Sequence, residues 1–461
     1  MFEEIPKVEN QSYWQSMEQW KAGLNCSPFF LLLFFIAVLP FVPKVNEWWE
    51  KLGNKLILSG LCALAGIWLY VAPTGDHGKI WETFLEYAAF LSLLGALFTV
   101  SGGIHISGAF AGLPYINTLF LGLGGFLASF LGTTGASMIL IRPLLRANRL
   151  RKHKTHIVVF FIFIVSNCGG VLTPLGDPPL YLGFLRGVPF FWTFRLIPVW
   201  ALILLILLFI FHILDDRIFD EEEKNMRVNL IREIEGAERT IHIQGWPNVF
   251  FLFAILATIL VSGDLIYPGL RESQGEKAAQ EISKIFQIFM MTGIGIFSHR
   301  MTSPKIHYDN QFSFAPIQEV AVLFLGIFGS MIPTLALLEA KGQSLALAHP
   351  WQYFWFSGFL SSFLDNAPTY LSFATLAAGQ NGLTADHLGT LAEKFPHLLA
   401  AISCGSVLMG ANSYIGNGPN FMVKAIAEYM GVKMPSFGGY LLWSLSVLVP
   451  VFILVTFVFF G

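Results

Sequence analysis

Two carboxylates stand alone in long stretches of sequence that carry no other charged residue. Asp177 is the only Asp, Glu, Lys or Arg in 155–185, and Asp365 is the only one in 342–385. A charge near the centre of a membrane helix costs about 2.5–3.5 kcal/mol, so an ion, a proton or a partner should neutralise each carboxylate. We expect ion binding at Asp365, whereas Asp177 could equally cap a broken helix.

Neutral oxygen-bearing side chains gather near both carboxylates, where Gly and Pro interrupt apolar stretches. Hard cations prefer such oxygen ligands. Each single Asn or Thr could instead satisfy backbone groups freed by the interruption, but the cluster as a whole favours cation binding. The candidate ion- and proton-binding residues are Asp365, Asn366, Thr369, Asp177, Asn167, Thr173, Asn412, Ser413, Asn417, Asn420, Thr133 and Thr134, with Na⁺ expected at Asp365, Asn366 and Asn412.

Four other polar residues near membrane depth have simpler interpretations. His105 could relay protons, but a hydrogen-bonded packing histidine is the favoured interpretation. Lys424 is expected to anchor a helix end at the interface. Glu86 and Glu319 lie near the starts of their spans, where interfacial water should solvate them.

The elements that position these residues must be membrane helices. Of the 461 residues, 54% are hydrophobic and only 13% are charged, and the mean hydropathy is +0.62. About 20 apolar residues are needed for a helix to cross the hydrocarbon core. This pattern predicts an all-α polytopic membrane protein with about ten spans, at 28–43, 55–72, 86–108, 157–185, 194–213, 246–263, 285–298, 317–338, 396–427 and 437–460.

Two further apolar stretches, 113–148 and 350–379, are each interrupted by a short polar cluster, at 132–135 and 365–368. We interpret both as re-entrant hairpins. Non-helical backbone at this depth is tolerated only where protein or a water-filled cavity satisfies its polar groups, so both tips should face an internal site.

The order of features in 28–213 recurs in 246–460 as three spans, a hairpin, a broken span and a final span. Each broken span contains Asn followed by Gly-Asp/Asn-x-Pro, which places Asn167 and Asn412 at corresponding positions. Five full crossings per unit make the repeat inverted. The predicted organisation is an N-terminal segment (1–27), a first repeat (28–213), a cytoplasmic linker (214–245) and a second repeat (246–461).

The basic segment 146–154 should lie in the cytoplasm by the positive-inside rule, and counting spans from it puts both termini outside. We expect a multi-pass protein of the cell (inner) membrane.

The segment from Ser166 to Pro179, Ser-Asn-Cys-Gly-Gly-Val-Leu-Thr-Pro-Leu-Gly-Asp-Pro-Pro, closely resembles the signature of NhaD-type sodium/proton antiporters in the ion transporter superfamily. Matching motifs lie at 98–104, 365–368 and 416–420, so the resemblance runs from about residue 86 to 429. It implies inverted repeats, two hairpins, separate scaffold and transport regions, and commonly a dimer. Where the superfamily usually has Asn after Gly-x-Pro-Pro this chain has Leu180, so the second half should dominate ion binding.

The leading functional hypothesis is a secondary active transporter that exchanges Na⁺ for H⁺, because one carboxylate can hold either ion in turn. The alternatives are a sodium-coupled di- or tricarboxylate symporter and an arsenite efflux permease, since one fold plan serves several substrates.

No organic cofactor is expected. The expected partners are membrane lipids, small ions and a second copy of the chain. A net charge of −2 gives no basic surface for nucleic acid, and the absence of HExxH, GxSxG and GxxxxGK[ST] motifs argues against an enzyme.

Overall fold

The computed structural model describes residues 13–107, 112–236, 242–344 and 347–461. Almost all of its regular structure is helical. The exceptions are two three-residue strands, β1 (His105–Ser107) and β2 (His242–Gln244), which pair antiparallel. Eight helices of the described residues are long and apolar enough to cross a membrane. Seven correspond to predicted spans and the eighth is the first limb of the first predicted hairpin, so the all-α polytopic fold is confirmed.

The helices follow the predicted order. In the first half they are α2 (Gln19–Val38), α3 (Val45–Trp49), α4 (Leu52–Thr74), α5 (Gly78–Gly102), α6 (Pro114–Leu131), α7 (Thr133–Ala147), α8 (Thr155–Ile164), α9 (Pro178–Leu185) and α10 (Ile197–Gly236). In the second half they are α11 (Pro247–Leu260), α12 (Tyr267–Gln274), α13 (Glu276–Met301), α14 (Pro304–Asp309), α15 (Ala315–Lys341), α16 (Pro350–Ser361), α17 (Asn366–Gln380), α18 (Gly389–Lys394), α19 (Pro396–Leu408), α20 (Gly418–Tyr429) and α21 (Phe437–Val455).

Several boundaries differ from the prediction. The spans predicted at 28–43 and 285–298 are α2 and α13, which begin at Gln19 and Glu276. The span predicted at 86–108 is a helix from Gly78 to Gly102, and β1 takes its last residues. The predicted linker 214–245 begins inside α10, which continues as helix to Gly236. Its Glu, Lys and Arg residues are good helix formers, so a polar composition ends the apolar span without ending the helix.

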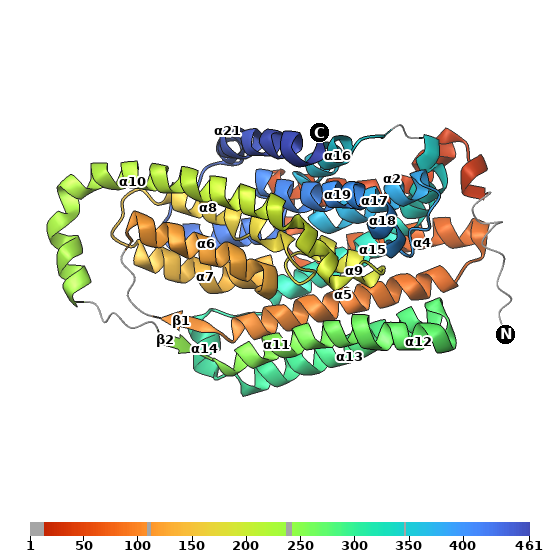
Figure 1. The fold of residues 1–461 in the computed structure, drawn as a ribbon, viewed down its shortest axis with the longest axis horizontal. Helices are drawn as coiled ribbons and strands as arrows, with labels where there is room; N and C mark the ends of the chain where they lie inside the picture. The colour runs from red at the N-terminus through yellow and green to blue at the C-terminus, as the bar shows by residue number, and fades with distance from the viewer. Residues whose placement is uncertain (1–12, 108–111, 237–241, 345–346) are drawn as a thin grey trace.

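One layer of the molecule consists of long helices packed side by side, α4 along α15 and α5 along α13. In Figure 1, α5 lies across the molecule with α11, α12 and α13 beneath it. Glycine permits the close approach of α4 and α15: a Cβ on Gly66 would lie 2.5 Å from the Cα of Ser330. We call α2, α4, α5, α11, α12, α13 and α15 the scaffold.

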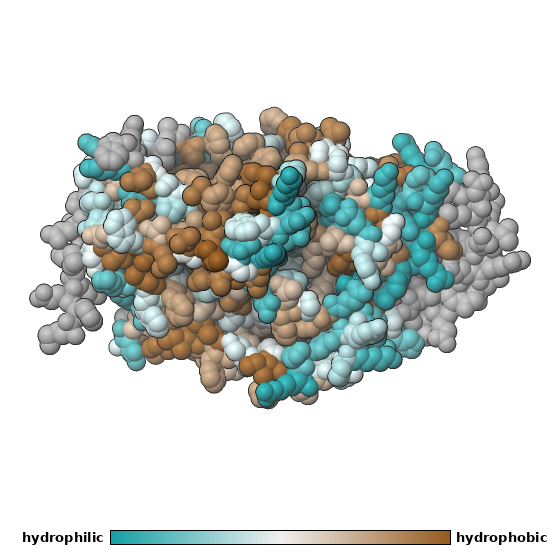
Figure 2. All heavy atoms as spheres, turned by 180° about the vertical axis from the view of Figure 1, so that it is seen from behind, coloured by the Kyte–Doolittle hydropathy of each residue, from teal (hydrophilic) through white to brown (hydrophobic). Residues whose placement is uncertain are grey.

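The hairpins and the broken helices form the other layer. At the centre of this layer, every residue of 157–165 is fully buried, which includes most of α8. Figure 1 shows the first hairpin, α6 and α7, in the left half and the second hairpin, α16 and α17, in the right half. Gly132 forms the first tip with a φ of 75°, a conformation that favours glycine. Figure 2 shows broad apolar surface across one face, as expected where lipid surrounds a protein.

Candidate functional site

Asp177 lies in the gap of the first broken helix, immediately before α9. The α8 helix ends at Ile164, and a short 3₁₀ turn, Cys168–Val171, separates it from α9. A capping side chain normally accepts from the N–H of the second or third helical residue. Here the first two residues are Pro178 and Pro179, which carry no N–H, and the N–H of Leu180 bonds the Asp177 carbonyl at 3.1 Å. The carboxylate is therefore left available for other partners.

Those partners come from three separate segments of the chain. Thr133 Oγ1 at the first hairpin tip donates to Asp177 Oδ1 at 2.9 Å, and Asn366 Nδ2 at the second tip donates to Oδ2 at 2.7 Å. Asn417 Nδ2 in the second broken helix donates to Oδ1 at 3.4 Å. Asp177 is 1% exposed. It is the point at which both hairpins and both broken helices meet.

Asp365 has a different environment. Its side chain accepts from the N–H of Ala367 at 3.1 Å and so caps α17, and the residue is only half-buried. Asp177 makes no capping bond of this kind, so the capping role considered for it is wrong. The carboxylate that caps a helix is Asp365, which the sequence pattern predicts to bind the ion. Asp365 lies at the second tip next to Asn366, the residue whose amide donates to Asp177.

A chain of asparagines continues the site away from Asp177. Asn417 Nδ2 also donates to Asn167 Oδ1 at 3.2 Å, and Asn167 Nδ2 donates to Asn420 Oδ1 at 2.7 Å. Asn420 Nδ2 then donates to the carbonyls of Gly410 and Ser413 at 2.9 and 2.8 Å. Four candidate side chains thus form one network that ties the two broken helices together.

Equivalent hydrogen bonds align the two broken helices residue by residue, and this alignment defines a register between them. Thr173 Oγ1 donates to the Ser129 carbonyl, and Ser413 Oγ donates to the Ser362 carbonyl. This register also pairs Asp177 with Asn417. Asp177 follows Gly176, which lies against Gly170, and Asn417 follows Gly416, which lies against Gly410 in the same way.

The same register corrects one sequence prediction. Asn167 lies ten residues before Asp177, whereas Asn412 lies five residues before Asn417. They are not equivalent positions, and only Asn167 belongs to the asparagine network. Asn412 Nδ2 bonds Ser362 Oγ at 2.9 Å instead. Its Oδ1 is a buried acceptor with no partner among the described residues, which suits a cation ligand.

Thr134 and Thr369 stand apart from the hydrogen bonds to Asp177. Thr369 Oγ1 donates to the Asp365 carbonyl within its own helix at 3.1 Å. Thr134 lines a small cavity of about 60 Å³ between the first tip and the scaffold residues Pro316, Ile317 and Val320.

Three hairpin serines are absent from the candidates above. Ser361 Oγ donates to Asn366 Oδ1 at 2.7 Å and fixes the amide that faces Asp177. Ser129 and Ser362 make matching bonds to the carbonyls of Gly169 and Met409. The sequence carries a signal for them: 125–131 reads Gly-Phe-Leu-Ala-Ser-Phe-Leu and 358–364 reads Gly-Phe-Leu-Ser-Ser-Phe-Leu.

The remaining polar predictions have mixed outcomes. His105 is buried and its Nδ1 lies 2.7 Å from Asn310 Oδ1, which confirms a hydrogen-bonded packing role, although it lies in β1. Lys424 pairs with Glu428 at 3.0 Å on α20.

Glu86 is not solvated as predicted: it is 3% exposed and lies 3.0 Å from Arg186 Nη2 and 3.3 Å from Lys284 Nζ. Among the described residues, no group of three or more His, Cys, Asp and Glu could hold a metal ion.

Comparison with models of known protein families identifies a family for this chain. A family model described as putative citrate transport matches residues 19–460, which is nearly the whole chain. A search of curated proteins finds no match.

Proposed function

Since this chain belongs to the putative citrate transport family and is an integral membrane transporter, we propose that it exchanges Na⁺ for H⁺ at Asp177. The observation that carries the proposal is the setting of that carboxylate. It is buried, its side-chain partners are the neutral donors Thr133, Asn366 and Asn417, and it pairs with no Lys, Arg or His of the described residues.

A buried carboxylate without a cationic partner is strongly disfavoured in its charged form. Na⁺ or a proton neutralises it equally well in charge. Because both ions need the same carboxylate, binding of one displaces the other, and exchange follows without further coupling machinery.

The neighbouring side chains suit both states. Three donors face the two carboxylate oxygens, which stabilises the ionised form. A hydroxyl can donate or accept, so Thr133 can reverse its bond when the carboxyl group carries a proton. The interrupted backbone of the broken helices supplies carbonyl oxygens of the kind that Na⁺ prefers, and Asn412 Oδ1 is a buried acceptor with no partner among the described residues. Asp365 adds negative potential that favours a cation.

The two hairpin tips give a route to alternating access. Thr133 and Asn366 touch opposite oxygens of Asp177 from hairpins that occupy opposite halves of the molecule. Movement of either tip relative to the scaffold uncovers the carboxylate toward one side. The small cavity beside the first tip, about 60 Å³, is large enough for an ion or water.

The test uses the purified protein in sealed liposomes that contain a pH-sensitive dye. A Na⁺ gradient should drive proton movement in the opposite direction, and its loss on replacing Na⁺ by choline would show that the cation is required. If an imposed Na⁺ gradient moves no protons at any pH between 6 and 9, the exchange proposal is wrong.

The family description favours a second candidate, carriage of citrate together with a cation. A tricarboxylate next to Asp177 would be repelled unless bound cations lie between them. Uptake of labelled citrate into the same liposomes distinguishes the two. Citrate uptake that depends on Na⁺ without proton exchange would replace antiport, while the cation site at Asp177 would remain.

A further inference from the structure

The surface of the scaffold carries a furrow that plays no part in the site above. It runs between α5 and α13 and encloses about 670 Å³. Small residues form much of its floor, among them Ala88, Ser92 and Gly95 on α5 and Gly295 on α13. These short side chains leave the space between the two long helices open. The furrow therefore results from the way α5 and α13 pack against each other.

Three of the four hydroxyls that line the furrow donate to backbone carbonyls, and the fourth, on the exposed Thr292, has no partner among the described residues. Ser92 Oγ donates to the Ala89 carbonyl at 2.9 Å, and Thr99 Oγ1 donates to the Gly95 carbonyl at 2.7 Å. Tyr87 OH donates to the Ala321 carbonyl at 2.9 Å. A hydroxyl that donates to a backbone carbonyl has no second hydrogen to donate to another partner. The furrow therefore suits an apolar occupant rather than water or an ion.

Its length matches a lipid chain. The lining extends along α5 from Phe84 to Thr99, and fifteen steps at about 1.5 Å per residue give roughly 22 Å. One leaflet of a hydrocarbon core that is about 30 Å thick spans roughly 15 Å. The furrow is long enough for one acyl chain in its full extent.

One end of the furrow is cationic. His299 and Arg300 close it at the C-terminus of α13, next to the end of α5 that leads into β1. Arg300 is exposed and pairs with no carboxylate of the described residues. A guanidinium recognises phosphate through paired hydrogen bonds. This is the end that the positive-inside rule assigns to the cytoplasm.

We propose that the furrow binds an anionic phospholipid of the cytoplasmic leaflet, with one acyl chain between α5 and α13 and its phosphate at Arg300. An exposed arginine at the polar end of an apolar furrow complements a molecule with an anionic head and an apolar tail. A second copy of the chain would need a projecting ridge to enter the same space, and it would not account for the cation.

The test measures lipid binding to the purified detergent-solubilised protein by native mass spectrometry. Phosphatidylglycerol and phosphatidylcholine with identical acyl chains are titrated separately. Phosphatidylglycerol should bind about fivefold more tightly, since one basic residue near an anionic headgroup contributes about 1 kcal/mol. Arg300→Ala should reduce that preference to near one, and Arg300→Lys should restore part of it.

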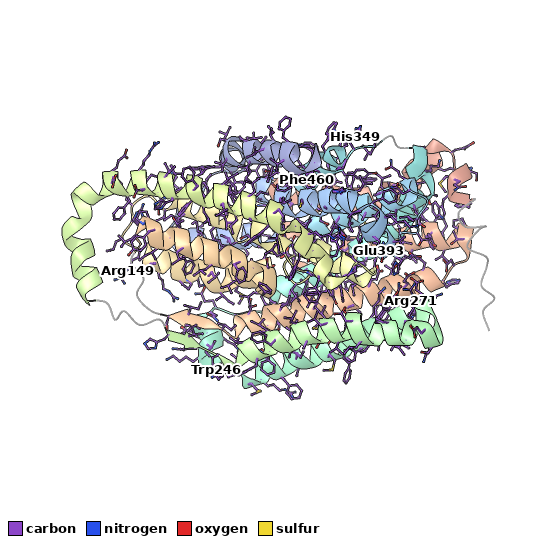
Figure 3. The ribbon with its side chains drawn as sticks, viewed as in Figure 1. Arg149, Trp246, Arg271, His349, Glu393 and Phe460 are labelled. Carbon is purple, nitrogen blue, oxygen red and sulfur yellow. The ribbon has the colours of Figure 1, made fainter. Side chains whose placement is uncertain are left out.

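A second variant addresses the chain rather than the head. Gly295→Leu places a side chain in the furrow, and its Cβ would meet Ala96 at an ordinary 3.5 Å, so the fold should tolerate it. It should lower binding of both lipids. Arg271→Ala is the matched control, because it removes an exposed arginine from α12 at the other end of the scaffold (Figure 3). Its lipid preference should be unchanged.

Four results would overturn the proposal, three from the lipids and variants and one from a competitor. The first is equal binding of the two lipids to the wild-type protein, and the second is a preference that survives Arg300→Ala. The third is a dimer that Gly295→Leu dissociates while lipid binding is unaltered, which would identify the furrow as an interface between copies. Glycerol phosphate is added as a competitor: if it displaces the lipid at equal concentration, the headgroup alone accounts for binding and the acyl-chain site is refuted.

Discussion

At the scale of single residues, the contrast between Asp177 and Asp365 comes from the position of proline in the helix that follows each one. Asp365 has an N–H two residues later, on Ala367, and the carboxylate uses it. Asp177 is followed by two prolines and has no such donor. The carboxylate that cannot cap its own helix is the one that reaches the hairpin tips.

We expect Asp177→Asn to abolish Na⁺-driven proton movement while the protein stays folded, since the amide keeps the size of the side chain but cannot exchange a proton. In the wild type, protons compete with Na⁺, so the apparent Na⁺ affinity should fall as pH falls. Stopped-flow dye measurements in liposomes across pH 6–9 test both statements. Residual antiport with a wild-type pH profile would locate the exchange elsewhere.

Substitution of Asp365 should act mainly on stability. Asp365→Ala removes an N-cap and should destabilise the protein by about 1 kcal/mol, whereas Asp365→Asn retains a good cap and should be close to neutral. Both variants should retain antiport, with weaker Na⁺ binding because a nearby negative charge is lost. Denaturant titration and transport by the same preparations check this prediction. Complete loss of antiport in Asp365→Asn would return the primary role to Asp365.

At the scale of elements, the two broken helices share a structural feature, a proline at the same position. The second helical residue after each break is proline, Pro179 in α9 and Pro419 in α20, so neither Asp177 nor Asn417 has a donor there. In both, the N–H of the third residue bonds the carbonyl of the capping residue instead. Proline at this position frees the side chain that precedes it for contact with other segments.

The role of this proline can be tested by a substitution that restores the missing backbone N–H. Pro179→Ala supplies a donor two residues after Asp177, and the carboxylate should then divide its bonds between this cap and the hairpin tips. We expect a weaker apparent Na⁺ affinity, by about tenfold for a hydrogen bond of 1.4 kcal/mol to a charged group. Pro368→Ala in α17 is the control, because the Asp365 cap already has its donor. Equal effects of the two changes would refute the argument.

A buried ionic cluster joins the scaffold to the layer of hairpins and broken helices. Arg186, at the end of α9, and Lys284, on α13, both pair with Glu86 on α5. Glu86→Ala would remove the carboxylate that pairs with both buried cations, and we expect a loss of about 3–5 kcal/mol in the free energy of unfolding. Unfolding by denaturant measures it, with Glu82→Ala on the same helix as the control. A change below about 1 kcal/mol would show that the cluster does not stabilise the interface.

At the scale of the whole molecule, the two halves present their hairpins from opposite ends. Figure 3 shows Arg149, after the first hairpin, at the left end, and Glu393, after the second, in the right half. Both residues are exposed. If the repeats are inverted across a bilayer, these two positions lie on opposite sides of it.

Thiol labelling of intact cells tests that arrangement. In a background that lacks the four native cysteines, all of which are buried and free, a membrane-impermeant maleimide should label Glu393→Cys from outside. Arg149→Cys should react only after permeabilisation, as expected for a basic cytoplasmic segment. Labelling of both positions from the same side would contradict the inverted topology.

The sequence by itself determined the features that depend on neighbouring residues. Apolar runs of sufficient length specify membrane helices, and Gly and Pro specify where those helices break. For that reason the all-α polytopic fold, seven of the ten predicted spans and the isolation of Asp177 and Asp365 could be read directly. The break residues also carried the resemblance to ion transporters, and the family of the chain agrees with it at the level of a membrane transporter.

Only the tertiary structure decided which polar groups meet. Asp177 contacts Thr133, Asn366 and Asn417, which lie 44, 189 and 240 residues away along the chain. Glu86 contacts Arg186 across 100 residues, so a carboxylate at the start of a span is buried rather than solvated. Local patterns set the direction and length of each helix, but contacts at such separations depend on how the helices pack. Packing is set by the shapes of many side chains together, which no single segment contains.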